Sequence, residues 1–141
     1  MAYNNIMAVY DGTLAADDLL DMVCRIARAH RARLTILHID LVPLQQPLPA
    51  YQPGADDAID ALVAKGEKLA DGRGVKAASA VRYARAVGAA VIAEARVRGI
   101  DLVALLVPPQ DKLPPDRCLS TDIEIVLHRL GCSVLLCRPA R

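Results

Sequence analysis

Residues 6–13 read Ile-Met-Ala-Val-Tyr-Asp-Gly-Thr, a short apolar run that ends in a turn. Apolar side chains then recur at helical spacing over Leu14–His30. Residues 34–39 are again mostly apolar, as expected of a strand that helices cover on both faces. A strand, a helix and a second buried strand in this order predict two parallel strands joined by a right-handed crossover.

The same alternation continues to the end of the chain. Helical periods cover residues 59–70 and 86–98, and strands are predicted at 75–83, 102–107 and 134–136. Residues 121–124, Thr-Asp-Ile-Glu, form a capping box, which predicts a last helix with Thr121 as its N-cap and Glu124 reaching back. All nine prolines lie outside these segments. The sequence therefore predicts an α/β fold, a single doubly wound, five-stranded parallel sheet with helices on both faces.

Composition excludes several classes of protein. The 141 residues correspond to about one domain, and 54% of them are apolar, which excludes a disordered chain. A net charge of +1 argues against a nucleic-acid partner. No apolar run is long enough to insert into a membrane, and the first residues do not resemble a signal peptide. The four cysteines form no CxxC pair, so we expect reduced thiols and a cytoplasmic location.

A ligand of such a sheet binds beyond the carboxyl ends of its strands. The loops that the predicted strands place there are residues 11–13, 39–42, 85–88 and 107–120. A candidate site is therefore sought in these four segments.

Five segments, in the right order, resemble the universal stress protein family. Residues 6–13 look like the first strand and turn of that family, and 34–39 and 100–105 look like its second and fourth strands. Residues 124–127 and 131–136 are similar to its closing helix and strand. The resemblance covers residues 1–141 as one domain. It implies the strand order 3-2-1-4-5, an ATP site, and dimers that pair through the last strand, here Val134, Leu135 and Leu136.

The family's ATP-binding pattern, G-x-x-G-x9-G-[ST], is not conserved in this chain. The resemblance places its positions at Val107, Gln110, Ser120 and Thr121, and assigns contact with the adenine end of the nucleotide to Asp11. Thr13 and Ile39 complete the candidate nucleotide site. However, no glycine occurs between Gly99 and Gly131, four prolines remove backbone donors, and Asp122 adds a carboxylate at the helix start. All three changes oppose the binding of a triphosphate.

Each candidate residue also has a purely structural interpretation. Asp11 fits an Asx-type cap as well as a ligand contact, and Thr13 and Thr121 fit helix N-caps. Lys112 and Arg117 fit solvated loop charges better than an anion site. His38 is expected to be a core histidine with satisfied hydrogen bonds. The three histidines lack the spacing of ligands, so we expect no metal site; they are His30, His38 and His128.

The sequence therefore favours a non-enzymatic, dimeric stress-response or regulatory domain with weak or no ATP binding and no cofactor. It contains no GxSxG, HExxH or GxGxxG motif, so no catalytic residue is assigned. One alternative is a sensor that holds ATP or AMP through Asp11 and Ser120. Another is a cytosolic regulatory domain or partner of a membrane transporter, because residues 42–48 resemble variants of the domain attached to permeases and antiporters.

Overall fold

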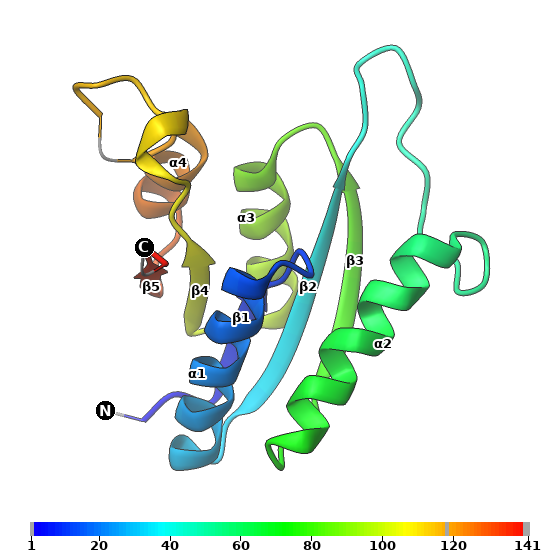
Figure 1. Ribbon diagram of the computed structural model, residues 1–141, viewed down its shortest axis with the longest axis vertical. Helices are drawn as coiled ribbons and strands as arrows, with labels where there is room; N and C mark the ends of the chain where they lie inside the picture. Colours follow the sequence, from blue (N-terminus) through cyan, green and yellow to red (C-terminus); the bar gives the residue numbers. More distant parts are fainter. Residues whose placement is uncertain (1, 118, 140–141) are drawn as a thin grey trace.

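The computed structural model, which describes residues 2–117 and 119–139, contains five parallel strands in the order β3-β2-β1-β4-β5 (Figure 1). The predicted fold class and strand order are confirmed. The strands are β1 (Asn5–Val9), β2 (Arg33–Leu41), β3 (Ala78–Ala84), β4 (Leu102–Leu106) and β5 (Ser133–Cys137). The helices are α1 (Leu14–His30), α2 (Asp57–Gly72), α3 (Val87–Arg98) and α4 (Thr121–Arg129), with a 3-10 turn η1 (Gln110–Lys112).

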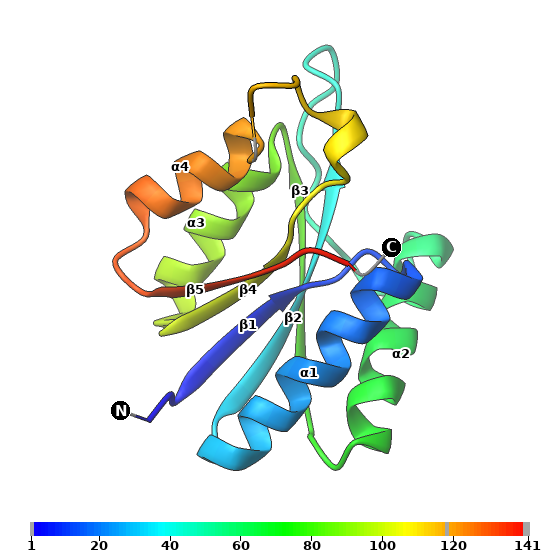
Figure 2. The ribbon, with the colours of Figure 1, turned by 60° about the vertical axis from the view of Figure 1, so that its left-hand side comes forward.

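The helices form two layers, one on each face of the sheet (Figure 2). One apolar cluster joins α1 and α2 to the sheet, and a second joins α3 and α4 to its other face. Neighbouring strand residues alternate between the clusters: Ile36 belongs to the first and Leu37 to the second, and both are fully buried. A strand buried on both faces explains why β2 shows no polar alternation.

The strand expected at residues 75–83 begins later than predicted. The Val75 N–H donates to the Ala70 carbonyl oxygen at 3.0 Å, and the Val75 side chain is buried with Ala70 against α1. Gly74 supplies the positive φ that this reversal needs. Residues 75–77 therefore follow the end of α2, and β3 begins at Ala78. An apolar residue is needed at position 75 because Val75 packs at the end of α2, and not because it belongs to a strand of the sheet.

Both proline-containing loops, residues 42–56 and 107–120, project from the carboxyl end of the sheet (Figure 1). The Arg85 guanidinium, at the end of β3, donates to the carbonyl oxygens of Val42 and Pro43 and so ties the first loop to the sheet. None of the helices described is long and apolar enough to cross a membrane. Cys24, Cys132 and Cys137 are free thiols, and Cys118 lies outside the described residues.

Candidate functional site

A cavity of about 310 Å³ lies where the strand order reverses, between the carboxyl ends of β1 and β4. Its walls come from the ends of three strands, the start of α3, the loop after β4 and the start of α4. The lining residues are Val9, Tyr10, Asp11, Ile39, Val87, Leu105, Leu106, Pro108, Ser120, Asp122, Ile123 and Val126. This is the position in a doubly wound sheet where ligands bind.

The structure brings three of the seven predicted nucleotide-site residues together in this cavity, namely Asp11, Ile39 and Ser120. Thr13, Val107 and Thr121 lie outside its walls. The backbone of Gln110 forms part of η1, and its side chain lies outside the described part of the chain. Among the described side chains at the four motif positions, only that of Ser120 lines the cavity.

The turn between β1 and α1 has the geometry of a helix cap. Asp11 Oδ1 accepts hydrogen bonds from the Thr13 N–H at 3.0 Å and from the Thr13 hydroxyl at 2.6 Å. Thr13 is the N-cap of α1, and its Oγ1 accepts from the Ala16 N–H at 3.2 Å. The Asx-type cap expected at Asp11 is therefore present, and Asp11 also lines the cavity.

The start of α4 corrects the predicted capping box. Ser120, not Thr121, is the N-cap, and its Oγ accepts from the Ile123 N–H at 3.3 Å. Thr121 is the first helical residue, and its hydroxyl accepts from the Arg117 guanidinium at 3.3 Å. The Glu124 carboxylate lies 3.6 Å from the same guanidinium and makes no capping-box hydrogen bond. Because Ser120 and Thr121 are adjacent and both carry a hydroxyl group, the sequence alone does not decide which of them is the N-cap.

Asp122 joins the starts of α3 and α4. The N-cap of α3 is Ala86, which offers no side-chain acceptor, and Asp122 Oδ1 instead accepts from the Gly88 N–H at 2.8 Å. A Cβ atom on residue 88 would lie 3.0 Å from the Asp122 carbonyl oxygen, so glycine permits this close approach. One carboxylate therefore stands at the positive ends of two helix dipoles.

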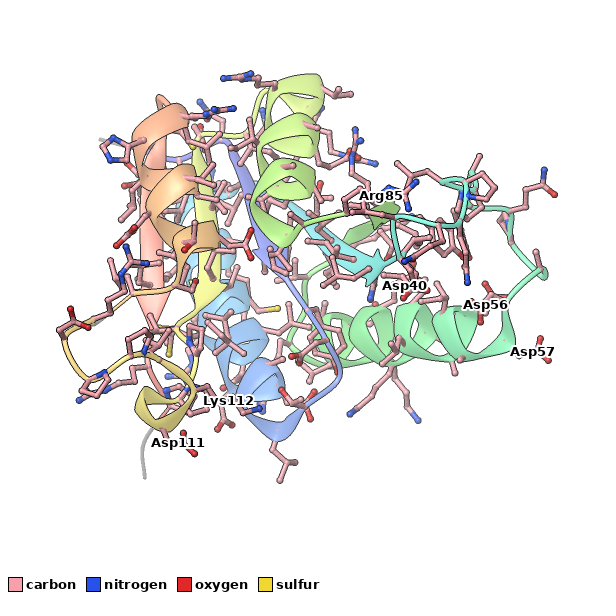
Figure 3. The ribbon with its side chains drawn as sticks, turned by 90° about the horizontal axis from the view of Figure 1, so that it is seen from above. Asp40, Asp56, Asp57, Arg85, Asp111 and Lys112 are labelled. Atoms are coloured by element: carbon pink, nitrogen blue, oxygen red, sulfur yellow. The ribbon has the colours of Figure 1, made fainter. Side chains whose placement is uncertain are left out.

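Two backbone N–H groups of the loop between β4 and α4 are bonded to carbonyl oxygens of the same loop. The Lys112 N–H donates to the Pro109 carbonyl oxygen, and the Arg117 N–H donates to the Pro114 carbonyl oxygen, both at 3.0 Å. Prolines 108, 109, 114 and 115 have no N–H to offer. Figure 3 shows Lys112 on η1 and Arg85 at opposite sides of this end of the sheet. Neither side chain lines the cavity.

Tyr10 lines the cavity, although the sequence predicts it only as the end of a strand. Its side chain is buried, and its hydroxyl donates to Asp17 Oδ1 at 2.5 Å. Burial, reinforced by the Asp17 carboxylate, raises the pKa of Tyr10. The apolar walls, such as Val87 and Ile123, were also missed, since the sequence shows that they are apolar but not which cavity they face. The only feature of the sequence that points to Tyr10 as a cavity residue is its position directly before Asp11.

His38 is buried, as predicted, but its hydrogen bonds are not satisfied. Its side chain is 1% exposed, and neither ring nitrogen has a hydrogen-bond partner among the described residues. The imidazole instead meets the Tyr10 ring edge-on, with ring centroids 5.9 Å apart. Burial lowers the pKa of His38, against the opposing effect of the Glu67 carboxylate, so the neutral ring is favoured. The core position is as expected, but no described protein group supplies the hydrogen bonds expected of a satisfied core histidine.

The described residues contain no group of three or more His, Cys, Asp or Glu side chains placed to hold a metal ion. The strand order and the cavity at its reversal define a doubly wound α/β domain with the architecture of a ligand-binding protein. The chain belongs to the universal stress protein family, whose sequence profile matches residues 2–138.

Solved structures support the same fold. A universal stress protein in complex with cAMP is 19% identical, with a TM-score of 0.73 over 96% of this chain and 97% of that one. The protein UspA from Lactobacillus plantarum is 20% identical, with a TM-score of 0.70 over 98% of this chain and 99% of that one. A universal stress protein from Archaeoglobus fulgidus in complex with dAMP is 11% identical, with a TM-score of 0.69 over 96% and 98%. A search of curated proteins found no match.

Proposed function

We propose that this universal stress protein domain, residues 1–141, is a non-enzymatic regulatory or interaction domain of the cytoplasm. It forms dimers and binds ATP weakly or not at all. The observation that carries the proposal is the Asp122 carboxylate, which accepts the Gly88 N–H and lines the cavity. A triphosphate in this cavity would place its negative charge beside that carboxylate, at helix N-termini whose positive ends the protein already neutralises.

The loop after β4 supports the same conclusion. Phosphate-binding loops surround the anion with free backbone N–H groups. Here four positions are proline, and the N–H groups of Lys112 and Arg117 are already bonded to proline carbonyl oxygens. These four prolines and two bonded N–H groups reduce the number of backbone donors that the loop could offer to a phosphate.

A binding role is favoured over catalysis by the state of the polar side chains in the cavity. Asp11 accepts from Thr13, Ser120 caps α4, Asp122 accepts from Gly88, and the Tyr10 hydroxyl donates to Asp17. Each group is held in a structural hydrogen bond. A nucleophile with an adjacent base would instead be needed for covalent or general-base chemistry.

Calorimetric titration of ATP–Mg²⁺ into the purified protein tests the proposal. We expect the titration to show no binding of ATP–Mg²⁺ with a dissociation constant in the micromolar range. Micromolar affinity would overturn the proposal and favour the alternative, an ATP- or AMP-binding sensor. That alternative is supported by Asp11 and Ser120 in the cavity walls and by the cAMP and dAMP complexes of the similar structures.

A transporter partner is a second alternative. The loop after β2 exposes apolar side chains to solvent: Leu44 is 82% exposed and Leu48 is 49% exposed. Exposed apolar groups close together are typical of contact surfaces. A permease gene beside the gene of this protein would support this alternative, and a comparison of binding by wild type and Leu44→Ser to that permease would test it.

A further inference from the structure

The ligand class of the cavity follows from its walls. Eight of the twelve lining residues are apolar, and they are contributed by β1, β2, β4, α3, α4 and the loop after β4: Val9, Ile39, Val87, Leu105, Leu106, Pro108, Ile123 and Val126. A volume of about 310 Å³ lies at the lower end of the range for small-molecule sites. Such a cavity accommodates a molecule of about the size of a nucleoside.

The polar wall is rich in acceptors and negative charge. Asp11 and Asp122 supply two carboxylates, and Ser120 supplies a hydroxyl. Among the described residues that line the cavity there is no lysine, arginine or histidine. The walls therefore favour ligands that donate hydrogen bonds, and they repel anions.

Asp122 is held where a ligand's phosphate would otherwise be attracted. It lies in the first turn of α4, and its Oδ1 accepts from the Gly88 N–H in the first turn of α3. Glu124, in the same part of α4, is paired with Arg117 at 3.6 Å and does not line the cavity. Of the two carboxylates in the first turn of α4, only that of Asp122 lines the cavity, where it could contact a bound molecule.

We propose that Asp122 is the specificity-determining residue of this cavity, and that the cavity binds a hydrogen-bond-donating molecule of about nucleoside size that carries no negative charge, while rejecting its phosphorylated forms. This inference rests on the proposed function, which holds that ATP binding is weak. It adds a ligand class and the residue that selects it. Adenosine and AMP are suitable probes because they differ by a single phosphate.

The test measures dissociation constants of adenosine, AMP and ATP–Mg²⁺ by calorimetry for wild type, Asp122→Asn and Glu124→Gln. Wild type should bind adenosine at least about tenfold more tightly than AMP, the ratio expected from one charge repulsion in a partly screened site. Asp122→Asn keeps an oxygen that can accept from Gly88, and it should reduce this ratio by about tenfold. Glu124→Gln removes the same charge from the same helix outside the cavity and should leave the ratio unchanged.

Three results would overturn the inference: AMP binding as tightly as adenosine to wild type, no adenosine binding at millimolar concentration, or the same change in both variants. If ATP also remains unbound in these cases, the proposed function stands and only the ligand class fails. Micromolar ATP binding by wild type would overturn both.

A measurement on wild type alone covers the case in which Asp122→Asn does not fold. Charge repulsion is screened by salt, so raising the ionic strength should lower the adenosine-to-AMP affinity ratio. A ratio that does not change with salt would contradict selection by charge.

Discussion

Gly12 allows the turn that places Asp11 at the cavity. Its φ is +80°, and a Cβ atom on this residue would collide with Cδ2 of Leu62 on α2. Lys65 of α2 also reaches the turn, with its Nζ donating to the Gly12 carbonyl oxygen at 2.7 Å. The turn is therefore fixed in part by Lys65 of α2, which lies 53 residues later in the sequence.

Gly12→Ala should lower the free energy of unfolding by about 1–2 kcal/mol, because a side chain disfavours the left-handed region. Urea denaturation measures the change. Gly72→Ala is the matched control, since Gly72 ends α2 with open space around it, and it should leave stability unchanged or slightly higher. Equal midpoints for wild type and Gly12→Ala would show that the turn tolerates a side chain.

His38 makes folding sensitive to acid. Its pKa in the folded protein is lowered by burial, whereas the unfolded chain takes up a proton near the ordinary value of about 6.5. The unfolded state then binds more protons between these two pKa values, so the stability present above pH 6.5 is lost as the pH falls.

His38→Leu should flatten the dependence of unfolding free energy on pH between about 7 and 5, because it removes this titration. Chemical denaturation at several pH values provides the measurement. His128→Asn alters an exposed histidine on α4 and should retain the slope of wild type. A His38→Leu profile parallel to that of wild type would exclude His38 as the source of acid sensitivity.

At the scale of elements, the start of α4 contributes both the helix cap and part of the cavity wall. Ser120 both caps this helix and lines the cavity, whereas Thr121 faces Arg117. Because the N-cap is Ser120 and not Thr121, the hydroxyl group that a ligand in the cavity could contact is that of Ser120.

Ser120→Ala should lower the free energy of unfolding by about 1 kcal/mol through loss of the cap, and Thr121→Ala should lower it less. Thermal and urea unfolding of the two variants compare them directly. The reverse order of effects would restore Thr121 as the cap.

The elements with clear periodicity could be predicted from sequence, and the helix Leu14–His30 is an example. The start of β3 could not, because Val75 is apolar for its contact with the end of α2. Three cavity residues could be predicted: Asp11 and Ile39 from their places near the carboxyl ends of β1 and β2, and Ser120 from the family resemblance. The link between Asp122 and Gly88 spans 34 residues and leaves no local sequence signal.

At the scale of the whole molecule, the sheet ends on one side at β5, which pairs with β4 in parallel register. All five of its residues, including Val134, Leu135 and Leu136, are only partly buried. An apolar edge strand presents backbone N–H and C=O groups to a further strand. Pairing between two copies of this edge is the dimer that we propose.

Leu135→Glu should convert the dimer to a monomer in light scattering, because the added charge opposes burial of the edge. Leu127→Glu places the same charge on an exposed position of α4 and should leave the dimer intact. Circular dichroism confirms that both variants are folded. A folded Leu135→Glu protein with the mass of wild type would refute pairing through β5.

The central strand β1 comes before the other four strands in the sequence, so it is synthesised before them. β1 acquires its neighbour β2 early, but its other edge remains unpaired until β4, about a hundred residues later, has been synthesised. During that interval a nascent chain exposes an apolar edge that invites mispairing with other chains. Because the cavity walls run from Val9 to Val126, the cavity is complete only after both halves of the sheet have been synthesised and joined.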